Sequence, residues 1–233
     1  MHEECLVCKA PLEYLDHSEP MECVFCHKTV QSQARCINGH FVCDECHTQG
    51  IDSIVSVCLA ETSKNPFEIF DKLISLPTCH MHGPEHHIMV GASLLTAYHN
   101  AGGALDLTKA LDLMQERGRQ VPGGICGFWG SCGAAVSSGI FCSIVTGSTP
   151  LATESWGLCN QMTSCSLQAI GAVGGPRCCK RNGYLAITEG VRFAAERLAV
   201  QMESSAITCR HTTQNNQCLG IKCPFNPHSP NKI

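Results

Sequence analysis

Apolar residues at helical spacing dominate the chain from about residue 50 onward and predict a series of α-helices. Four of these helices carry a capping residue or a proline at their start, and these start signals are Asp52, Asn65-Pro66, Pro84 and Asp106. Three further helices are expected at roughly 131–146, 155–172 and 184–203. Together the patterns predict six or seven helices in this part of the chain.

The first 48 residues differ in character, because they are polar and rich in turns and contain few apolar side chains. Strand-like alternation is expected only in this segment. A segment of this kind buries too little apolar surface to fold without another source of stability. The predicted fold class is therefore mainly α. A small N-terminal zinc-ribbon or cross-brace module, residues 1–48, precedes a helical, cysteine-rich domain, residues 49–233.

Composition narrows the classes of function. The net charge is −4 and only 6% of the 233 residues are aromatic, which disfavours a nucleic-acid partner. No apolar run reaches about 18 residues, so no membrane-spanning helix is expected. The N-terminus lacks the features of a secretory signal, and the 19 cysteines are odd in number. These observations favour reduced thiols, metal sites and a cytoplasmic protein, and the charged fraction of 15% hints at a homo-oligomer.

Four pairs of metal-ligand residues occupy the N-terminal segment. A CxxC turn places two sulfurs on one side of a tight loop, and two such pairs complete a tetrahedral site. The four pairs predict two zinc ions in closed, structural sites, with iron as the alternative metal. The pairs are Cys5/Cys8, Cys23/Cys26, Cys36/His40 and Cys43/Cys46.

Two ways of joining these pairs are open. Sequential sites would join the first pair to the second and the third to the fourth. The spacing Cys36-x3-His40-x2-Cys43-x2-Cys46 resembles the middle of a RING-type cross-brace, which favours interleaved sites. His27 and His47 each follow a CxxC pair, and they are expected to be solvated.

Further cysteines gather at glycine-rich loops in the helical half. Ser131 is placed to cap a helix, so that Cys132 lies in its first turn, where the helix dipole favours a thiolate. Cys58 and Cys142 lie among apolar residues and are expected to be buried and inert. The loop Cys218-Leu-Gly-Ile-Lys-Cys223-Pro224 has the Cys-Pro step of iron–sulfur loops. The expected ligands of an iron–sulfur cluster, or alternatively the reactive thiols, are Cys126, Cys132, Cys165, Cys178 and Cys179.

A cluster of histidines precedes and opens the helix at Pro84. Residues 78–87 contain four His, one Glu and one Cys. His82 and His86 are expected to serve as acid and base beside Cys132, the candidate catalytic thiol, with Glu85 orienting an imidazole. The three residues are predicted to face the same cavity as Cys132 and the Cys178-Cys179 loop.

These residues carry a resemblance to a known family. The helical half resembles an uncharacterised family of anaerobic bacteria and archaea, domain of unknown function 5714. More distantly, residues 123–134 and Asn160-Gln-Met-Thr-Ser-Cys165 are similar to the C-GCAxxG-C-C redox proteins. The chain departs from that motif, because Gly and Ala follow Cys132 in the order Cys-Gly-Ala. The motifs of the first resemblance are His82-Gly-Pro-Glu-His-His87, Trp129-Gly-Ser-Cys-Gly-Ala134, Arg177-Cys-Cys179 and Cys218-Leu-Gly-Ile-Lys-Cys-Pro224.

The first resemblance implies no known reaction. With the cysteines of the helical half in view, the leading expectation is a redox or sulfur-handling protein of anaerobic metabolism, with a redox protein, a radical-SAM enzyme or a methyltransferase as partner. The alternative is a non-catalytic adaptor whose zinc ions are all structural. The residues leave open whether the chain is an enzyme.

Overall fold

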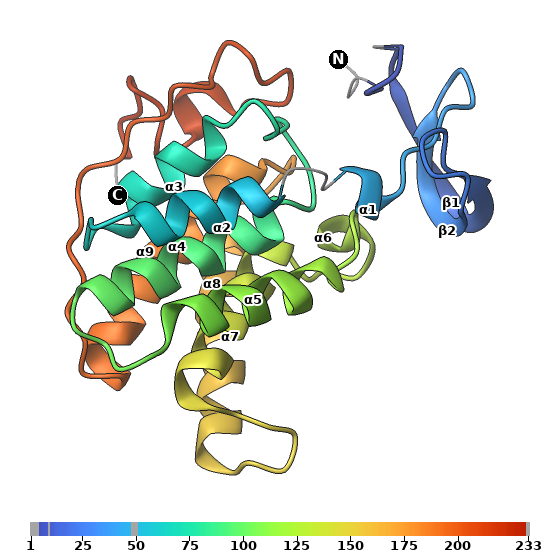
Figure 1. Ribbon diagram of the computed structural model, residues 1–233. Coiled ribbons are helices and arrows are strands. Elements are labelled where there is room, and N and C mark those ends of the chain that lie inside the picture. The colour runs from blue at the N-terminus through green and yellow to red at the C-terminus, as the bar shows by residue number, and fades with distance from the viewer. Residues whose placement is uncertain (1–4, 9, 48–50, 232–233) are drawn as a thin grey trace.

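The computed structural model describes residues 5–8, 10–47 and 51–231, in which the chain forms two strands, nine α-helices and one 3-10 helix (Figure 1). The elements are β1 (Leu12–Glu22), β2 (Thr29–Cys36), α1 (Asp44–His47), α2 (Ile51–Ala60), α3 (Pro66–Ile74), α4 (His86–Asn100), α5 (Leu107–Arg119), α6 (Ile125–Phe128), α7 (Gly133–Thr146), α8 (Glu154–Val173), α9 (Cys179–Arg197) and η1 (Gly220–Lys222).

The N-terminal module, residues 5–47, is built on a single antiparallel hairpin. Leu12 pairs with Cys36 at one end of the hairpin, and Glu22 pairs with Thr29 at the other. The register shifts between Tyr14 and Glu19, which bends the ribbon. Figure 1 shows the module as a separate lobe beside the helices. The module confirms the small zinc-ribbon-like unit expected from the sequence.

Helix α4 lies at the centre of the helical domain. It packs against α3, α5, α7 and α9, and nearly every residue from His86 to Tyr98 is buried. A helix buried on all sides needs no polar face, so its apolar residues do not form a single stripe. The described residues form seven helices longer than two turns, α4 included, in agreement with the predicted number. None of the helices in the described part of the chain combines the length and apolar composition that crossing a bilayer demands.

Two of the predicted helix starts are confirmed in atomic detail. The Asn65 side chain accepts a hydrogen bond from Phe67 N at 3.0 Å, and Asp106 accepts one from Lys109 N at 3.2 Å. Both satisfy backbone groups that the first helical turn leaves without a partner. Helix α2 begins at Ile51, so Asp52 lies inside it and is not the cap.

The last long helix differs from the prediction at both ends. It begins at Cys179, five residues before the expected start, because the sulfur of Cys178 accepts a hydrogen bond from Arg181 N and caps it. It ends at Arg197, and Ala199 then adopts a φ of +54°, which the helix cannot accommodate. The chain therefore leaves the helix earlier than the apolar stripe suggested.

The segment from Leu198 to Asn231, the tail, has no long regular element and runs back over the helices (Figure 1). Glu203 N donates to Lys64 O at 3.0 Å, which fixes the tail beside the start of α3. Further on, Cys209 N donates to Phe225 O at 2.8 Å and closes a loop. This loop carries the last cysteines of the chain to the start of α9.

Candidate functional site

The first group of metal-ligand residues joins the chain before β1 to the turn after β2. The sulfurs of Cys5, Cys8 and Cys36 and a ring nitrogen of His40 lie within 4.8 Å of one another. Cys8 Sγ lies 3.5 Å from Cys36 Sγ and 3.3 Å from His40 Nδ1. Sulfurs around a tetrahedral zinc ion, with Zn–S bonds of about 2.3 Å, lie about 3.8 Å apart. The group therefore has the dimensions of a single-ion site.

The second group lies at the other end of the hairpin and consists of Cys23, Cys26, Cys43 and Cys46, again within 4.8 Å. Cys26 Sγ lies 3.6 Å from Cys43 Sγ, and α1 carries Cys46. The first pair of ligands thus meets the third and the second meets the fourth. This is the interleaved arrangement of a cross-brace, and the two groups could hold two metal ions.

Backbone N–H groups point at the sulfurs of both groups. Val7 N donates to Cys5 Sγ and Asn38 N to Cys36 Sγ, each at 3.3 Å. A backbone hydrogen bond from Ala10 lowers the pKa of Cys8 to about 6. Such bonds stabilise thiolates, which are the form that binds metal.

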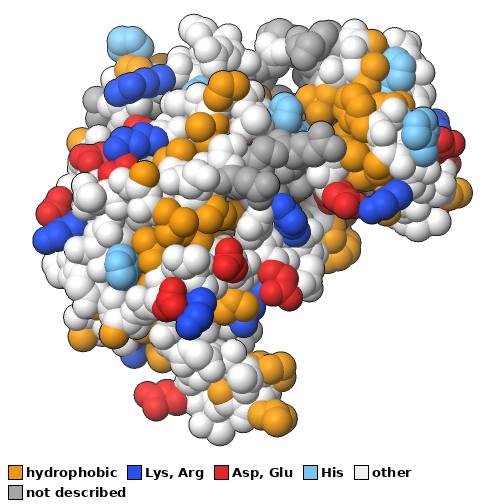
Figure 2. All heavy atoms as spheres, in the orientation of Figure 1, with side chains coloured by type: hydrophobic (Ala, Val, Ile, Leu, Met, Phe, Trp, Pro, Cys, Tyr) orange, Lys and Arg blue, Asp and Glu red, His pale blue; other side chains and the backbone are white. Residues whose placement is uncertain are grey.

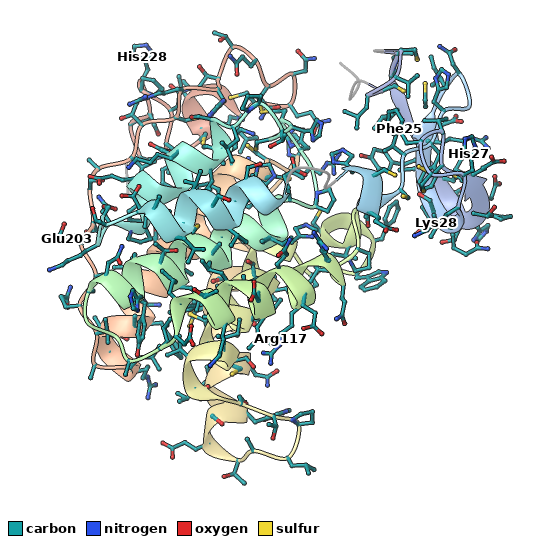
Figure 3. All side chains as sticks on the ribbon, in the orientation of Figure 1. Phe25, His27, Lys28, Arg117, Glu203 and His228 are labelled. Carbon is teal, nitrogen blue, oxygen red and sulfur yellow. The ribbon has the colours of Figure 1, made fainter. Side chains whose placement is uncertain are left out.

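The two histidines that follow CxxC pairs differ in environment. His27 is 74% exposed, bonds to Glu22 at 2.9 Å, and lies on the side of the module away from the helices (Figure 3). It is solvated, as expected. The expectation fails for His47, whose side chain is 18% exposed. Its Nδ1 lies 3.4 Å from Glu85 Oε2, in the helical domain, because α1 ends against the start of α4.

Glu85 is the centre of the histidine cluster. It is 3% exposed, and its Oε1 accepts a hydrogen bond from His80 N at 2.9 Å. Burial alone would raise the pKa of Glu85, but the neighbouring imidazoles of His47, His80 and His86 hold it well below its usual range. The structure also explains Gly83, since a Cβ there would lie 2.1 Å from Glu85 Oε2.

The carboxylate of Glu85 belongs to two further groups of candidate metal ligands. One group joins it to His47 and His80, and the other joins it to Cys79 and His86, with ligand atoms within 4.8 Å in each. His47 Nδ1, His80 Nδ1 and Glu85 Oε2 are buried and make no hydrogen bond of good geometry. Unsatisfied buried atoms that converge in this way have the character of a site that takes a cation.

Three cysteines and two histidines line a cavity of about 50 Å³ between α4, α6, α7 and α9. We call it the thiol cavity. Cys132 precedes α7, and its sulfur accepts a hydrogen bond from Asn182 Nδ2 at 3.3 Å. Burial raises the pKa of Cys179 to about 12, against the opposing effects of Arg177 and the Gly83 backbone. The sulfur-bearing residues of the cavity are Cys126, Cys132 and Cys179, and the imidazoles are those of His86 and His87.

His86, which lines the thiol cavity, has one unprotonated ring nitrogen. It is fully buried, and burial lowers its pKa to about 3, so the ring is neutral. Its Nδ1 lies 3.1 Å from Gly83 O, which can only accept, so Nδ1 carries the proton. The unprotonated Nε2 lies 3.7 Å from Cys79 Sγ and 3.5 Å from Lys180 Nζ. The ring can therefore accept a proton or bind a metal.

His82 faces a different sulfur. Its Nε2 lies 3.3 Å from Asn215 Oδ1, and Asn215 Nδ2 donates to Cys178 Sγ at 3.4 Å. Burial lowers the pKa of His82 to about 4. The cluster thus faces the sulfurs of the helical domain and not the solvent. His82 and His86 nevertheless approach two different cavities, so the predicted single cavity is in fact two.

The five cysteines expected as one ligand set do not meet at one point. Cys126, Cys132 and Cys179 share the thiol cavity, but Cys178 lines a separate cavity beside the tail. Cys165 lies on α8, packed against the core, and lines neither of these two cavities. Ser131 is not the cap of α7, because Cys132 itself occupies that position without a side-chain hydrogen bond.

The structure also brings in residues that the sequence did not single out. Asn182 and Asn215 each donate to a cysteine sulfur, yet asparagines at these positions carry no local signal. Cys79 and His80 lie inside the histidine-rich run, so the density of that run was the signal for them. Cys58 and Cys142 are fully buried, as predicted.

A groove of about 700 Å³ separates the N-terminal module from the helical domain (Figure 2). Its floor is bridged by few contacts. Arg177 donates to Tyr14 Oη at 2.7 Å and lies over the Tyr14 ring, and Gly123 N donates to Asp44 at 2.8 Å. Tyr14 also contacts Phe128, with ring centroids 6.1 Å apart.

Tyr14→Ala is therefore expected to loosen the docking of the module without unfolding either part. Both the ring contact and the hydrogen bond are lost, each worth about 1 kcal/mol. Small-angle scattering should show a larger radius of gyration for the variant. His17→Ala is the matched control, since His17 lies exposed on the same strand. An unchanged radius in Tyr14→Ala would contradict the assigned contact.

Comparison with known proteins gives one match. No curated protein and no solved structure matches the chain. The family model described as a family of unknown function, DUF5714, matches residues 54–226, which span the helices from α2 to α9 and most of the tail. The match includes the histidine cluster, the thiol cavity and the cysteines of the tail. The chain belongs to the DUF5714 family of unknown function.

Proposed function

We propose that this protein is a cytoplasmic redox or sulfur-handling protein of anaerobic metabolism. Its reactive centre is the thiol cavity, and an iron–sulfur cluster bound in the helical domain accompanies the thiols. The observation that carries the proposal is the convergence of three cysteines and two buried imidazoles, from four different parts of the chain, on one small cavity. Thiols that meet in this way can bind metal or exchange two electrons by forming a disulfide.

The metals of the N-terminal module are, in this proposal, two zinc ions. One group offers three sulfurs and one imidazole, and the other offers four sulfurs. Closed sites of these two compositions are typical of structural zinc, which has no redox chemistry. Metal analysis of the purified chain distinguishes zinc from iron.

Cys132 is the thiol on which the chemistry of the cavity depends. It lines the cavity together with Cys126 and Cys179, and its sulfur accepts a hydrogen bond from Asn182. The proton of His86 lies on Nδ1, beside Gly83 O, and the unprotonated Nε2 lies beside Cys79 Sγ and Lys180 Nζ.

Cys132→Ala should abolish disulfide formation in the thiol cavity. Diamide takes two electrons and two protons from two thiols, and in the wild type it should link Cys132 to a neighbour. The chain is kept under anaerobic conditions until the oxidant is added. Peptide mapping by mass spectrometry then detects the bridge. Cys165→Ala is the control, since its sulfur lies outside the cavity. Cys142→Ala should lower the free energy of unfolding by only about 1 kcal/mol, because it removes packing contacts alone. A wild-type chain that forms no bridge at Cys132 would contradict the proposal.

A second candidate function is a non-catalytic adaptor, and the groove between the module and the helices favours it. A partner protein, such as a radical-SAM enzyme or a methyltransferase, would bind there. An anaerobically purified chain that contains zinc alone, and whose cavity thiols resist diamide, would support the adaptor. Iron with acid-labile sulfide would support the redox protein.

A further inference from the structure

The tail brings three cysteines to the residue that caps α9. Cys209, Cys218 and Cys223 come from the irregular tail, and Cys178 precedes the helix. All four line a cavity of about 20 Å³, which we call the tail cavity. We propose that these four cysteines are the ligands of a [4Fe–4S] cluster. The inference rests on the proposed redox function and names the site of its cofactor.

Hydrogen bonds from the backbone reach every one of the four sulfurs. His211 N donates to Cys209 Sγ at 3.4 Å and Gly220 N donates to Cys218 Sγ at 3.3 Å. Arg181 N and the amide of Asn215 donate to Cys178, and a backbone hydrogen bond from Phe225 reaches Cys223. The N-terminal module shows the same arrangement, with donors two residues after Cys5 and Cys36. A neutral thiol is a weak acceptor, so this arrangement suits sulfurs that carry charge.

A glycine stands where the chain turns from Cys218 toward Cys223. Gly220 has a φ of +59°, a left-handed conformation that strains other residues. Its N–H donates to Cys218 Sγ, and it begins the short helix η1, which leads to Cys223. Pro224 follows at once, so the chain cannot continue as a helix. The Cys-Pro step noted in the sequence thus fixes the position of a ligand.

The walls of the tail cavity provide the low polarity and the positive charge that a cluster requires. Tyr184 and Phe225 are 2% and 1% exposed and exclude water from one side. Four thiolates bound to a [4Fe–4S]²⁺ core leave a net charge of −2. The guanidinium of Arg181 is buried beside the sulfurs, where two backbone carbonyls hold it at 2.8 Å each. A buried cation next to an anionic cluster compensates its charge.

The spacing of the sulfurs favours a cluster over a single ion. In the two groups of the N-terminal module, the ligand atoms lie within 4.8 Å of one another. The four sulfurs of the tail cavity surround one space but do not form so tight a group. A [4Fe–4S] cluster attaches its thiolates to four separate irons, so its ligands stand farther apart than those of one tetrahedral ion.

The site is loaded by an exchange of thiolate ligands on the cluster. A preformed [4Fe–4S] cluster with four small thiolate ligands meets four cysteine thiols of the chain. Four Fe–S bonds to the small thiolates break and four to the cysteines form, while each cysteine proton passes to a departing thiolate. No electron is gained or lost in this exchange.

The test uses the full chain with its N-terminal groups already loaded with zinc, under anaerobic conditions. The probe is the preformed thiolate-ligated cluster. We expect about four iron and four sulfide ions per chain, with the broad visible absorption of a cluster. Cys209→Ala/Cys218→Ala should lose this iron and sulfide, whereas the matched pair Cys126→Ala/Cys132→Ala should keep them. Circular dichroism and zinc content verify that both variants are folded.

A second measurement avoids variants altogether. In the wild-type chain, loading with the cluster should protect Cys178, Cys209, Cys218 and Cys223 from alkylation at least tenfold, with no comparable protection of Cys165. The proposal is overturned if these four stay reactive, if the protected set is that of the thiol cavity, or if iron binds without sulfide. The proposed thiol chemistry has a separate test, because it is contradicted if diamide forms no bridge at Cys132.

Discussion

Removal of metal will unfold the N-terminal module while helices α2 to α9 stay folded. The buried side chains of the module, in its described residues, are Cys5, Met21, Cys23, Cys36 and Cys43. Four of these five are candidate ligands, so the metal takes the place of a hydrophobic core. Metal binding supplies about 10–16 kcal/mol in comparable structural zinc units, far more than a single hairpin provides.

The measurement is an NMR spectrum of the full chain before and after chelation. Signals from residues 5–47 should collapse to the narrow range of an unfolded segment, while far-UV circular dichroism keeps most of its helical signal. Cys23→Ala should act like chelation at the second group. His27→Ala, which changes an exposed neighbour of Cys26, should leave the spectrum dispersed. Dispersed signals from a metal-free module would show that the hairpin folds by itself.

Phe70→Ala will destabilise the helical domain by about 3–5 kcal/mol. Phe70 on α3 is fully buried, and its ring packs edge-on against Tyr184 and His86, with centroids 5.3 and 6.5 Å away. Tyr184 in turn contacts Phe225 of the tail. The ring therefore supports both an imidazole of the thiol cavity and one wall of the tail cavity.

Urea denaturation of the zinc-loaded chain, followed by circular dichroism, measures the change. The midpoint should fall sharply in Phe70→Ala. Phe25→Ala removes the same atoms from a side chain that is 57% exposed, and it should leave the midpoint of helical unfolding in place. Equal midpoints for the two variants would mean that α3 contributes little to the core.

Local signals in the sequence were sufficient to predict where a helix begins if a capping residue lies at its start. Asn65-Pro66 and Asp106 mark the starts of α3 and α5, because a cap acts on the residues beside it. The start of α9 was placed at residue 184, although the helix includes Gly183 and begins at Cys179. In the structure, a Cβ at Gly183 would lie 2.4 Å from the ring of Phe70, so the glycine allows close packing inside a continuous helix.

The grouping of the cysteines depended on contacts between distant segments. Cys178 and Cys179 are adjacent, yet they face different cavities, because Cys178 is an extended capping residue and Cys179 begins the helix. The tail cavity forms only when Cys209 N meets Phe225 O and closes its loop. No spacing rule in the sequence specifies that contact. The interleaved pairing of the module was accessible because its spacing matched a known pattern.

The contact between His47 and Glu85 joins two parts of the chain that have different chemistry. His47 directly follows Cys46, a ligand of the second metal group, and Glu85 directly precedes His86, an imidazole of the thiol cavity. Metal that orders the module therefore also fixes the partner of Glu85, and linkage requires the effect to act equally in the reverse direction. Loss of the metal proposed for the module would therefore release His47 from Glu85 and change the surroundings of His86.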